Sequence, residues 1–215
     1  TVTVCKAALD AGVRRVVYAS SSSVYGGATR VPTPEGEPTF PRSPYAVTKL
    51  AGEHYCRVFT ELYGLETVAL RYFNVFGARQ RPDAAYAAVI PLFIDAVRRG
   101  DAPIVHGDGT QSRDFTYIDD VVRANLCAAH APAAQCAGHA YNIAGGESTS
   151  LLDILASLSR IFEREVTPEF TEPRAGDVYR SLGDPTAAAR DLGFRCEIPF
   201  EGGLRRTVEW LVSRD

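Results

Sequence analysis

The sequence predicts an α/β fold built on a parallel sheet, because helices and apolar strands alternate along it. Residues 1–11 carry apolar side chains at helical spacing, and residues 13–19 (VRRVVYA) form a short β-branched strand. The pattern repeats with a helix over 45–63 and a second apolar strand over 66–72 (ETVALRY). Strands that are each preceded by a helix pair in parallel, and near-continuous apolar strands are typical of sheets covered on both faces.

The rest of the chain continues with shorter elements. Residues 27–42 are rich in Pro and Gly and lack periodicity, which predicts a loop, and residues 74–86 form a second long loop. Apolar spacing, capping residues and glycine stops predict the later helices, which are expected over 89–99, 117–130, 150–162 (capped by Ser150), 185–193 and 204–212. Strands are expected over 102–106, 140–143 and 166–170. A turn over 107–109 and a loop over 171–177 complete the pattern.

The helix over 45–63 places a phenol and an ammonium on one face. Ser43 is a suitable N-cap and Pro44 suits the first turn, so Tyr45 and Lys49 lie one turn apart. Neither residue belongs to the apolar stripe that we expect to face the core, which comprises Val47, Leu50, Ala51, Tyr55, Val58, Phe59 and Leu62. Tyr45 and Lys49 are therefore not expected to be simple core residues.

A phenol beside an ammonium suits proton transfer. A tyrosine titrates near pH ~10 and is a poor base at neutral pH, but a positive charge within a few ångströms favours the phenolate. Tyr45 next to Lys49 then becomes a usable proton shuttle for an alcohol. The alternative is a surface helix with one aromatic residue and one solvated lysine. A serine cluster at residues 20–23 supports the first reading, since it follows the strand over 13–19, and open α/β sheets bind ligands at the carboxyl ends of their strands.

Composition excludes several classes of function. A net charge of −3 argues against nucleic acid or an anionic membrane as the main partner, and no apolar run is long enough to span a bilayer. The cysteines are odd in number and never spaced C-x-x-C, which predicts free thiols in the cytoplasm and no metal site. The chain has no methionine and begins at Thr1 inside a helix, so we expect a fragment that lacks its beginning.

Six stretches in order give the chain a specific resemblance, and they are VVYASSSSVYG, SPYAVTK, LRYFNVFG, GDGTQSRDFTYIDDV, YNIAGG and RAGDV. Along almost its whole length the chain resembles the extended short-chain dehydrogenase/reductases, in the branch of nucleotide-sugar epimerases and dehydratases. The resemblance implies the C-terminal part of a Rossmann-like, doubly wound parallel sheet plus a smaller α/β substrate-binding domain. Residues 1–74 would be the remainder of the NAD-binding domain, and residues 75–215 mainly bind the nucleotide sugar, with a return to the first domain near 103–130.

The resemblance also implies a catalytic set. Tyr45 would be the catalytic base with Lys49 as its partner, and Ser21 would hydrogen-bond the 4-hydroxyl of the sugar. Ser20 and Ser22 take that place if the register differs by one, and the alternative for all three is a turn whose hydroxyls only cap backbone N–H groups. The residues expected to contact NAD are Ser20, Tyr45, Lys49, Tyr72 and Phe73.

The same match implies the nucleotide-sugar site. Arg113 and Arg174 resemble a pyrophosphate clamp, since guanidinium groups suit phosphate geometry, although surface ion pairs are the alternative for each. The other residues expected to contact the nucleotide or the sugar are Asn74, Ala88, Val89, Asp177 and Ser181. Ser181 stands where a bulky tyrosine would exclude an N-acetyl group, so an acetamido sugar should fit and the smaller sugar should also be accepted.

Epimerisation is the reaction that the resemblance favours. Dehydratases of this branch carry an Asp-Glu pair directly after the catalytic Ser/Thr, whereas this chain has Ser22 and Ser23 there. We therefore expect NAD-dependent 4-epimerisation of UDP-N-acetylglucosamine and UDP-glucose. The alternatives are a UDP-glucuronate 4-epimerase or decarboxylase and a non-catalytic nucleotide-sugar-binding remnant. The resemblance further suggests a homodimer through the helix over 45–63 and the helix before it.

One departure from the family concerns the cofactor. The Gly-rich turn that would hold the NAD pyrophosphate is absent from the sequence, and so is the acidic residue for the adenosine ribose. Gly26-Gly27 and Gly145-Gly146 do not follow a strand and open a helix in that pattern. We expect these 215 residues alone to bind NAD weakly and to have little or no activity.

Overall fold

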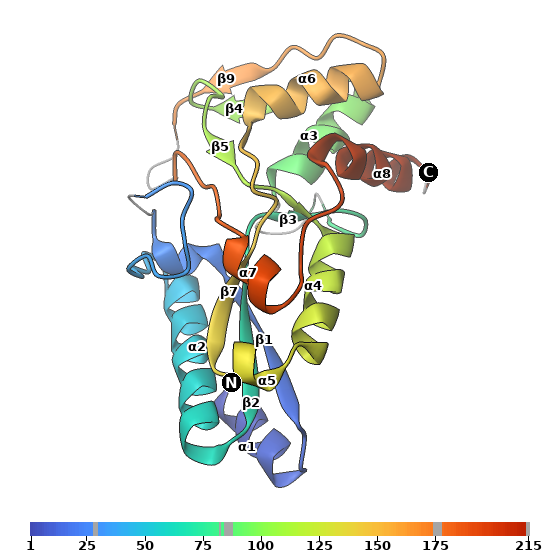
Figure 1. Cartoon of the computed structure of the whole chain (residues 1–215). Helices are drawn as coiled ribbons and strands as arrows, with labels where there is room; N and C mark the ends of the chain where they lie inside the picture. Colours follow the sequence, from blue (N-terminus) through green and yellow to red (C-terminus); the bar gives the residue numbers. More distant parts are fainter. Residues whose placement is uncertain (28–29, 82, 84–87, 174–177, 214–215) are drawn as a thin grey trace.

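The computed structural model describes the whole chain except residues 28–29, 82, 84–87, 174–177 and 214–215. A three-stranded parallel sheet forms the centre of the lower part in Figure 1, and a group of helices and short strands forms the upper part. No helix in the described residues is both long enough and apolar enough to cross a bilayer.

The central sheet confirms the predicted α/β fold. Its strands are β1 (Arg15–Ser21), β2 (Glu66–Tyr72) and β7 (His139–Ile143), in the order β1-β2-β7 and all parallel. Ser21 pairs with Tyr72, and Tyr72 pairs with Ile143, so the three strands end at one edge. β1 is an outer strand of this sheet. Side chains that follow the three strands are therefore brought together at the same edge.

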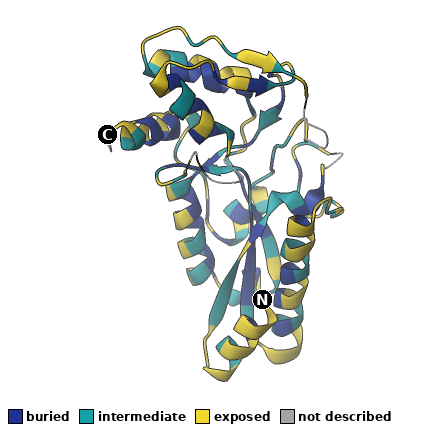
Figure 2. Ribbon diagram, turned by 180° about the vertical axis from the view of Figure 1, so that it is seen from behind, coloured by how far each residue is buried: buried dark blue, intermediate teal, exposed yellow. Residues whose placement is uncertain are grey.

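Helices cover both faces of the sheet, as side-chain alternation along a strand requires. Val16 and Tyr18 pack with residues of α1 and α2, whereas Val17 packs on the other face with residues of α4 and α7. The strand β2 is mostly buried and β1 is mostly half-buried, and Figure 2 shows the exposed outer sides of the flanking helices. The elements around the sheet are α1 (Val2–Asp10), the 3-10 turn η1 (Ser22–Tyr25), α2 (Pro44–Tyr63), α4 (Ile118–His130), α5 (Ala133–Cys136) and α7 (Thr186–Asp191). The strand β7 and the helices α4 and α7 thus bring later parts of the chain to the sheet.

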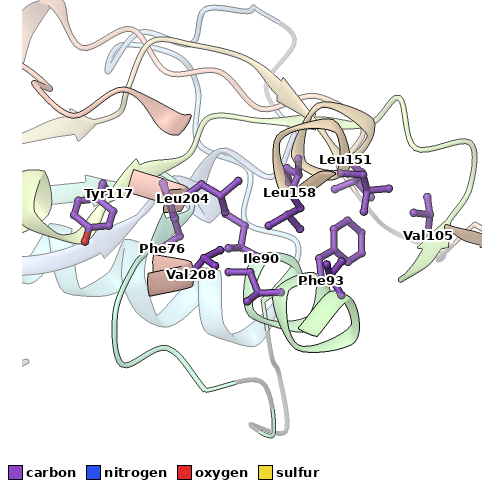
Figure 3. Packing of buried hydrophobic residues seen from close by; sticks show 13 residues of the cluster. Phe76, Ile90, Phe93, Val105, Tyr117, Leu151, Leu158, Leu204 and Val208 are labelled. Carbon is purple, nitrogen blue, oxygen red and sulfur yellow. The ribbon is translucent and has the colours of Figure 1, made fainter. Parts of the chain in front are cut away.

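The upper part has its own apolar core. Figure 3 shows the side chains of this cluster, among them Ile90, Phe93, Leu158 and Leu204, which are all almost fully buried. They come from α3 (Val89–Arg99), α6 (Leu151–Ile161) and α8 (Phe200–Val212). Short strand pairs complete this part, namely β3 (Val75–Phe76) with β6 (Thr116–Tyr117), β4 (Ile104–His106) with β9 (Glu169–Thr171), and the antiparallel β5 (Ser112–Arg113) with β8 (Thr149–Ser150).

Several predicted boundaries differ from the structure. β1 ends at Ser21, so Ser20 and Ser21 are the last residues of the strand and do not follow it. The strand expected over 166–170 begins only at Glu169, and the helix α5 was not expected. Ser43 caps α2 as predicted, because its side chain accepts a hydrogen bond from the Ala46 N–H at 3.1 Å.

The predicted buried stripe of α2 is correct only in part, because Phe59 is buried and Leu50, Ala51 and Val58 are partly buried. Val47, Tyr55 and Leu62 are exposed, and the fully buried residues of α2 are Ala46, Gly52, Glu53, Cys56 and Phe59. Gly52 faces the sheet because a Cβ atom there would lie 2.1 Å from the hydroxyl oxygen of Tyr18. Glycine and glutamate do not count as apolar residues in a hydrophobic pattern. The predicted stripe is therefore shifted from the face of α2 that is buried.

Candidate active site

A cavity of about 580 Å³ opens at the edge where the three strands end. It collects eight of the residues expected to be functional, and these are Ser20, Ser21, Tyr45, Tyr72, Phe73, Asn74, Arg113 and Ser181. They come from β1, α2, the end of β2, β5 and the chain before α7. Residues far apart in the sequence thus share one cavity, which is the arrangement expected of a ligand site.

Tyr45 and Lys49 lie together at this edge. Tyr45 is in the first turn of α2 and is 56% exposed, and Lys49 Nζ lies 5.5 Å from the centre of its ring. Lys49 Nζ also donates a hydrogen bond to the Ala19 carbonyl of β1 at 2.7 Å. The ammonium is therefore held between the phenol and the strand that carries Ser21. A fixed cation in this place supports a negative charge that develops on the tyrosine oxygen.

The two neighbouring serines have different surroundings. Ser21 Oγ accepts a hydrogen bond from the Ser23 N–H at 3.2 Å, so it caps η1, and its hydroxyl can still donate its proton. Ser20 is almost fully buried, and its hydroxyl donates to Glu53. Of the two, Ser21 has the hydroxyl that can serve a ligand in the cavity.

Aromatic and amide side chains form the inner wall. Phe73 is 2% exposed and packs against Tyr25. The Tyr72 hydroxyl donates to Asn125 at 3.0 Å, and burial raises the pKa of this tyrosine, so it stays neutral. Asn74 Nδ2 donates to the Asp114 carbonyl at 3.0 Å. The hydrogen bonds of Tyr72 and Asn74 thus fix these two side chains at the inner wall, and Phe73 supports the wall from the core.

A second cavity, of about 610 Å³, adjoins the first. Asn74, Val75 and Arg113 line both cavities, and Ala88 and Val89 line the second one. Arg113 Nη1 donates to the carbonyls of Ser112 at 3.0 Å and Tyr179 at 3.3 Å. A guanidinium at the junction of two cavities suits a phosphate that joins two larger groups. Arg174, the other predicted clamp residue, and Asp177, a predicted nucleotide-sugar contact, lie outside the described residues.

Sequence reasoning missed several lining residues. Arg42 and Arg180 line the first cavity, directly before the motif residues Ser43 and Ser181. Phe93, Leu92 and Ile104 give the second cavity an apolar wall. Their places next to motif residues are the only signal that the sequence offers for the two arginines. The apolar wall has no signal of its own, since the same residues read as ordinary helix and strand positions.

Asp114 is a further residue that the sequence did not single out. Its buried carboxylate accepts hydrogen bonds from the N–H groups of Gly145 at 2.7 Å, Gly146 at 3.1 Å and Gly183 at 3.1 Å. It therefore joins the turn after β7 and the chain after Ser181 to the segment of Arg113. Burial raises the pKa of Asp114 to about 6, against the opposing effect of the three N–H donors.

The raised pKa of Asp114 predicts a pH-dependent stability. The folded protein holds the Asp114 proton more tightly than the unfolded chain does. Protonated Asp114 therefore adds to the free energy of unfolding below pH ~4, and this stabilisation is lost as pH rises through about 6. In Asp114→Asn this titration is gone. The unfolding free energy of the unmodified protein minus that of Asp114→Asn should be greater at pH 4 than at pH 7, by about 2 kcal/mol. Urea unfolding at both pH values measures the difference, and a gap that widens toward pH 7 would contradict it.

The cavity residues fit one end of NAD but not the other. Tyr45 and Lys49 can hydrogen-bond a ribose, and the partly buried Tyr72 offers an aromatic surface for a flat ring. The N–H groups of Gly145 and Gly146 already donate to Asp114, so they do not form a phosphate cradle. Gly26 ends η1, and a Cβ atom there would lie 1.7 Å from the Phe40 carbonyl oxygen. The described residues thus suit the nicotinamide end of the cofactor.

Comparison with known proteins places the chain in a family. Residues 1–144 match the model of the NAD dependent epimerase/dehydratase family. The chain is 36% identical to a putative UDP-glucose 4-epimerase of Methanocaldococcus jannaschii, over 94% of this chain and 65% of that protein. It is 38% identical to a UDP-glucose 4-epimerase of Mycolicibacterium smegmatis, over 100% of this chain and 67% of that protein. The chain therefore belongs to the NAD dependent epimerase/dehydratase family, as its six sequence stretches predict.

Two solved structures show how similar the fold is. The UDP-N-acetylglucosamine 4-epimerase of Methanobrevibacter ruminantium, in complex with UDP-N-acetylmuramic acid, has a TM-score of 0.94 at 37% identity, over 99% of this chain and 67% of that one. The UDP-glucuronic acid 4-epimerase of Bacillus cereus, in complex with UDP-glucuronic acid and NAD, has a TM-score of 0.90 at 32% identity, over 100% of this chain and 66% of that one. The chain spans about two thirds of the length of these relatives.

Proposed function

We propose that this chain supplies the proton-transfer and UDP-sugar-binding residues of an NAD-dependent UDP-sugar 4-epimerase. The observation that carries the proposal is that Ser21 and Tyr45 share one cavity, which joins a second cavity at Arg113. The sugar would occupy the first cavity, the pyrophosphate would lie at Arg113, and the nucleoside would occupy the second. The proposal assigns the adenine end of NAD to a Gly-rich segment outside these 215 residues.

The residues of the first cavity control one proton. Tyr45 takes the proton from the sugar O4, Ser21 donates a hydrogen bond to the same oxygen, and Lys49 stabilises the phenolate form of Tyr45 that accepts this proton. Bound NAD supplies reversible hydride transfer at C4. When the sugar has turned its other face toward the nicotinamide, Tyr45 returns the proton to O4. Only the configuration at C4 changes. No carboxylate lies at Ser22 or Ser23 to remove water from the sugar.

Conversion of UDP-sugars by the protein tests the proposal. The chain is joined to the Gly-rich segment of a relative, supplied with NAD, and incubated with UDP-N-acetylglucosamine, UDP-glucose or UDP-glucuronate, and the products are separated. The proposal predicts 4-epimers without net consumption of NAD. A protein that binds UDP tightly but converts none of these sugars would be the non-catalytic alternative and would contradict the proposal.

The size of the side chain at position 181 should determine which hexoses fit. Ser181 lines the first cavity and is only partly buried, so a larger side chain has space to enter the cavity. In Ser181→Tyr we expect kcat/KM for UDP-N-acetylglucosamine to fall about 10²-fold relative to that for UDP-glucose, because the ring fills the acetamido space. Ser181→Ala is the matched control and should accept both sugars. An equal loss for both sugars in Ser181→Tyr would place the acetamido group elsewhere.

UDP-glucuronate is a second candidate substrate, because two arginines line the sugar cavity. Arg42 and Arg180 add positive charge beside Arg113, and no acidic side chain is among the described residues that line this cavity. A carboxylate on the sugar would pair with either guanidinium. A UDP-glucuronate 4-epimerase of Thermodesulfobacterium geofontis is also 34% identical to the chain. A higher kcat/KM for UDP-glucuronate than for UDP-glucose would favour this candidate.

We also propose that the protein is a homodimer. Val47, Tyr55, Leu62 and Tyr63 are exposed on α2, and Val2 and Val4 are exposed on α1. Two copies that pack these helices together would remove this apolar surface from water. The molar mass in solution, measured by light scattering, decides between one copy and two.

A cytoplasmic location is proposed on the state of the cysteines. All five are free thiols, and Cys5, Cys56 and Cys136 are buried. Unpaired thiols are typical of proteins in a reducing compartment.

A further inference from the structure

A buried ion pair contacts two residues that line the first cavity. Glu53 on α2 and Arg71 on β2 each have side chains that are 8% exposed. Arg71 Nε donates to Glu53 Oε1 at 3.0 Å, and Nη2 donates to Oε2 at 2.8 Å. Burial opposes the charge on Arg71, but the hydrogen bonds with Glu53 outweigh it and raise the pKa of the guanidinium. A bidentate pair of this kind fixes both side chains in one geometry, although burying two charges adds little net stability.

This pair holds both ends of the segment that contains Ser21. At one end, the Ser20 hydroxyl donates to Glu53 Oε1. At the other end, Arg71 Nη1 donates to the Tyr25 hydroxyl oxygen at 2.8 Å, and Tyr25 in turn donates to Asn142 at 2.8 Å. Ser21 lies between these two anchors. The position of its hydroxyl is therefore determined from both sides.

The same pair reaches the helix that carries the catalytic tyrosine. Glu53 follows Lys49 by four residues and Tyr45 by eight, so the three side chains lie along one face of α2 over about two turns. A link between Glu53 and the segment 20–25 thus sets the distance between α2 and the end of β1, which are neighbours in Figure 1. Ser21, which donates a hydrogen bond to O4, lies at the end of β1, and Tyr45, which accepts the proton, lies on α2.

We propose that the Glu53–Arg71 pair is a positioning device that holds Ser21 in register with Tyr45. This inference rests on the proposed function, and neither Glu53 nor Arg71 contacts the substrate in it. Proton transfer between positioned groups is sensitive to displacements of the order of 1 Å. Loss of the pair should therefore lower the rate of the chemical step and leave UDP-sugar binding nearly unchanged.

The chain contains a matched control for this proposal. Arg15 and Glu66 form a second ion pair between β1 and β2, at 2.6 Å, with side chains 5% and 24% exposed. They face each other at the opposite end of the same two strands, and neither lines a described cavity. Arg15 also donates to the carbonyls of Ala128 and Ala131, both at 2.7 Å. This second pair serves the fold alone.

The experiment compares Glu53→Gln with Glu66→Gln in the chain joined to the Gly-rich segment of a relative. We expect Glu53→Gln to lower kcat about 10²-fold and to keep KM within about twofold. Glu66→Gln should keep kcat within about twofold, even if it lowers the melting temperature as much as Glu53→Gln does. Equal kcat losses at equal loss of stability, or an unchanged kcat in folded Glu53→Gln, would overturn the proposal. Arg71→Lys, which keeps the charge but cannot reach Glu53 and Tyr25 together, replaces Glu53→Gln if that variant does not fold.

A second readout separates this proposal from the proposed function. Amide hydrogen exchange of residues 20–26 reports on the segment without any turnover. Glu53→Gln should exchange faster there than the unmodified protein, whereas Glu66→Gln should not. If no UDP-sugar is converted, the proposed function fails, but exchange still decides whether the pair holds the segment. Unchanged exchange in Glu53→Gln would refute the positioning role by itself.

Discussion

Replacement of Tyr45 by phenylalanine is expected to lower kcat for UDP-sugar epimerisation about 10²–10⁴-fold, the range that a positioned proton-transfer group contributes. The ring stays, so the cavity keeps its shape, and only the hydroxyl that exchanges a proton with O4 is lost. Arg113 and the second cavity are untouched, so the dissociation constant for UDP should stay within about twofold. Steady-state kinetics and calorimetric titration with UDP measure the two quantities.

Tyr55→Phe is the matched control for Tyr45→Phe. Tyr55 lies on the same helix, is 47% exposed and lines none of the described cavities. It should lose its hydroxyl without a change in kcat. If Tyr45→Phe keeps full turnover, another group moves the proton and the assignment of the base is wrong.

Replacement of Lys49 by methionine is the second change with a large expected effect. Lys49 Nζ lies 5.5 Å from the centre of the Tyr45 ring and donates to the Ala19 carbonyl at 2.7 Å. Methionine has a similar length but no charge, so the fixed cation beside the phenol disappears. We expect kcat to fall about 10²–10³-fold, the size of effect found when one preorganised donor is removed. NAD binding should weaken as well, and the dissociation constant for UDP should not change.

Two further variants test the role of Lys49. Lys6 is the other lysine of the sequence, and it forms an exposed ion pair with Asp10 on α1. Lys6→Met should leave kcat unchanged, because exposed pairs of this kind contribute little. Lys49→Arg should not restore full activity, because a planar guanidinium cannot occupy the same position between Tyr45 and Ala19. Full activity in Lys49→Arg would mean that only the charge matters.

The strands and helices of the sheet were predictable because each is encoded in a local pattern. The apolar runs at 13–19 and 66–72 and the helix caps at Ser43 and Ser150 each report on their own neighbourhood. The buried face of α2 was not predictable in the same way. It contains Gly52, chosen to accommodate Tyr18, and Glu53, which is buried because Arg71 arrives from β2. Both choices depend on a partner far away in the sequence.

The candidate site likewise contains residues that local motifs predict and residues that depend on distant partners. Ser21, Tyr45, Lys49 and Arg113 stand in short motifs, so the sequence singles them out and the structure brings three of them to one cavity with Lys49 beside it. Asp114 follows Arg113 directly, yet its function depends on N–H groups from Gly145, Gly146 and Gly183. Motifs identify groups that act on a ligand. The groups that hold those residues in place become visible only when distant segments meet.

The most direct test of the account follows the hydrogen atom at C4 of the sugar. UDP-N-acetylglucosamine that carries deuterium at C4 is converted by the joined protein in ordinary water, and the product is examined by NMR. The account confines proton exchange with Tyr45 and water to O4, so the 4-epimer should keep its deuterium at C4. A product in which this deuterium has been replaced by hydrogen from water would contradict the account.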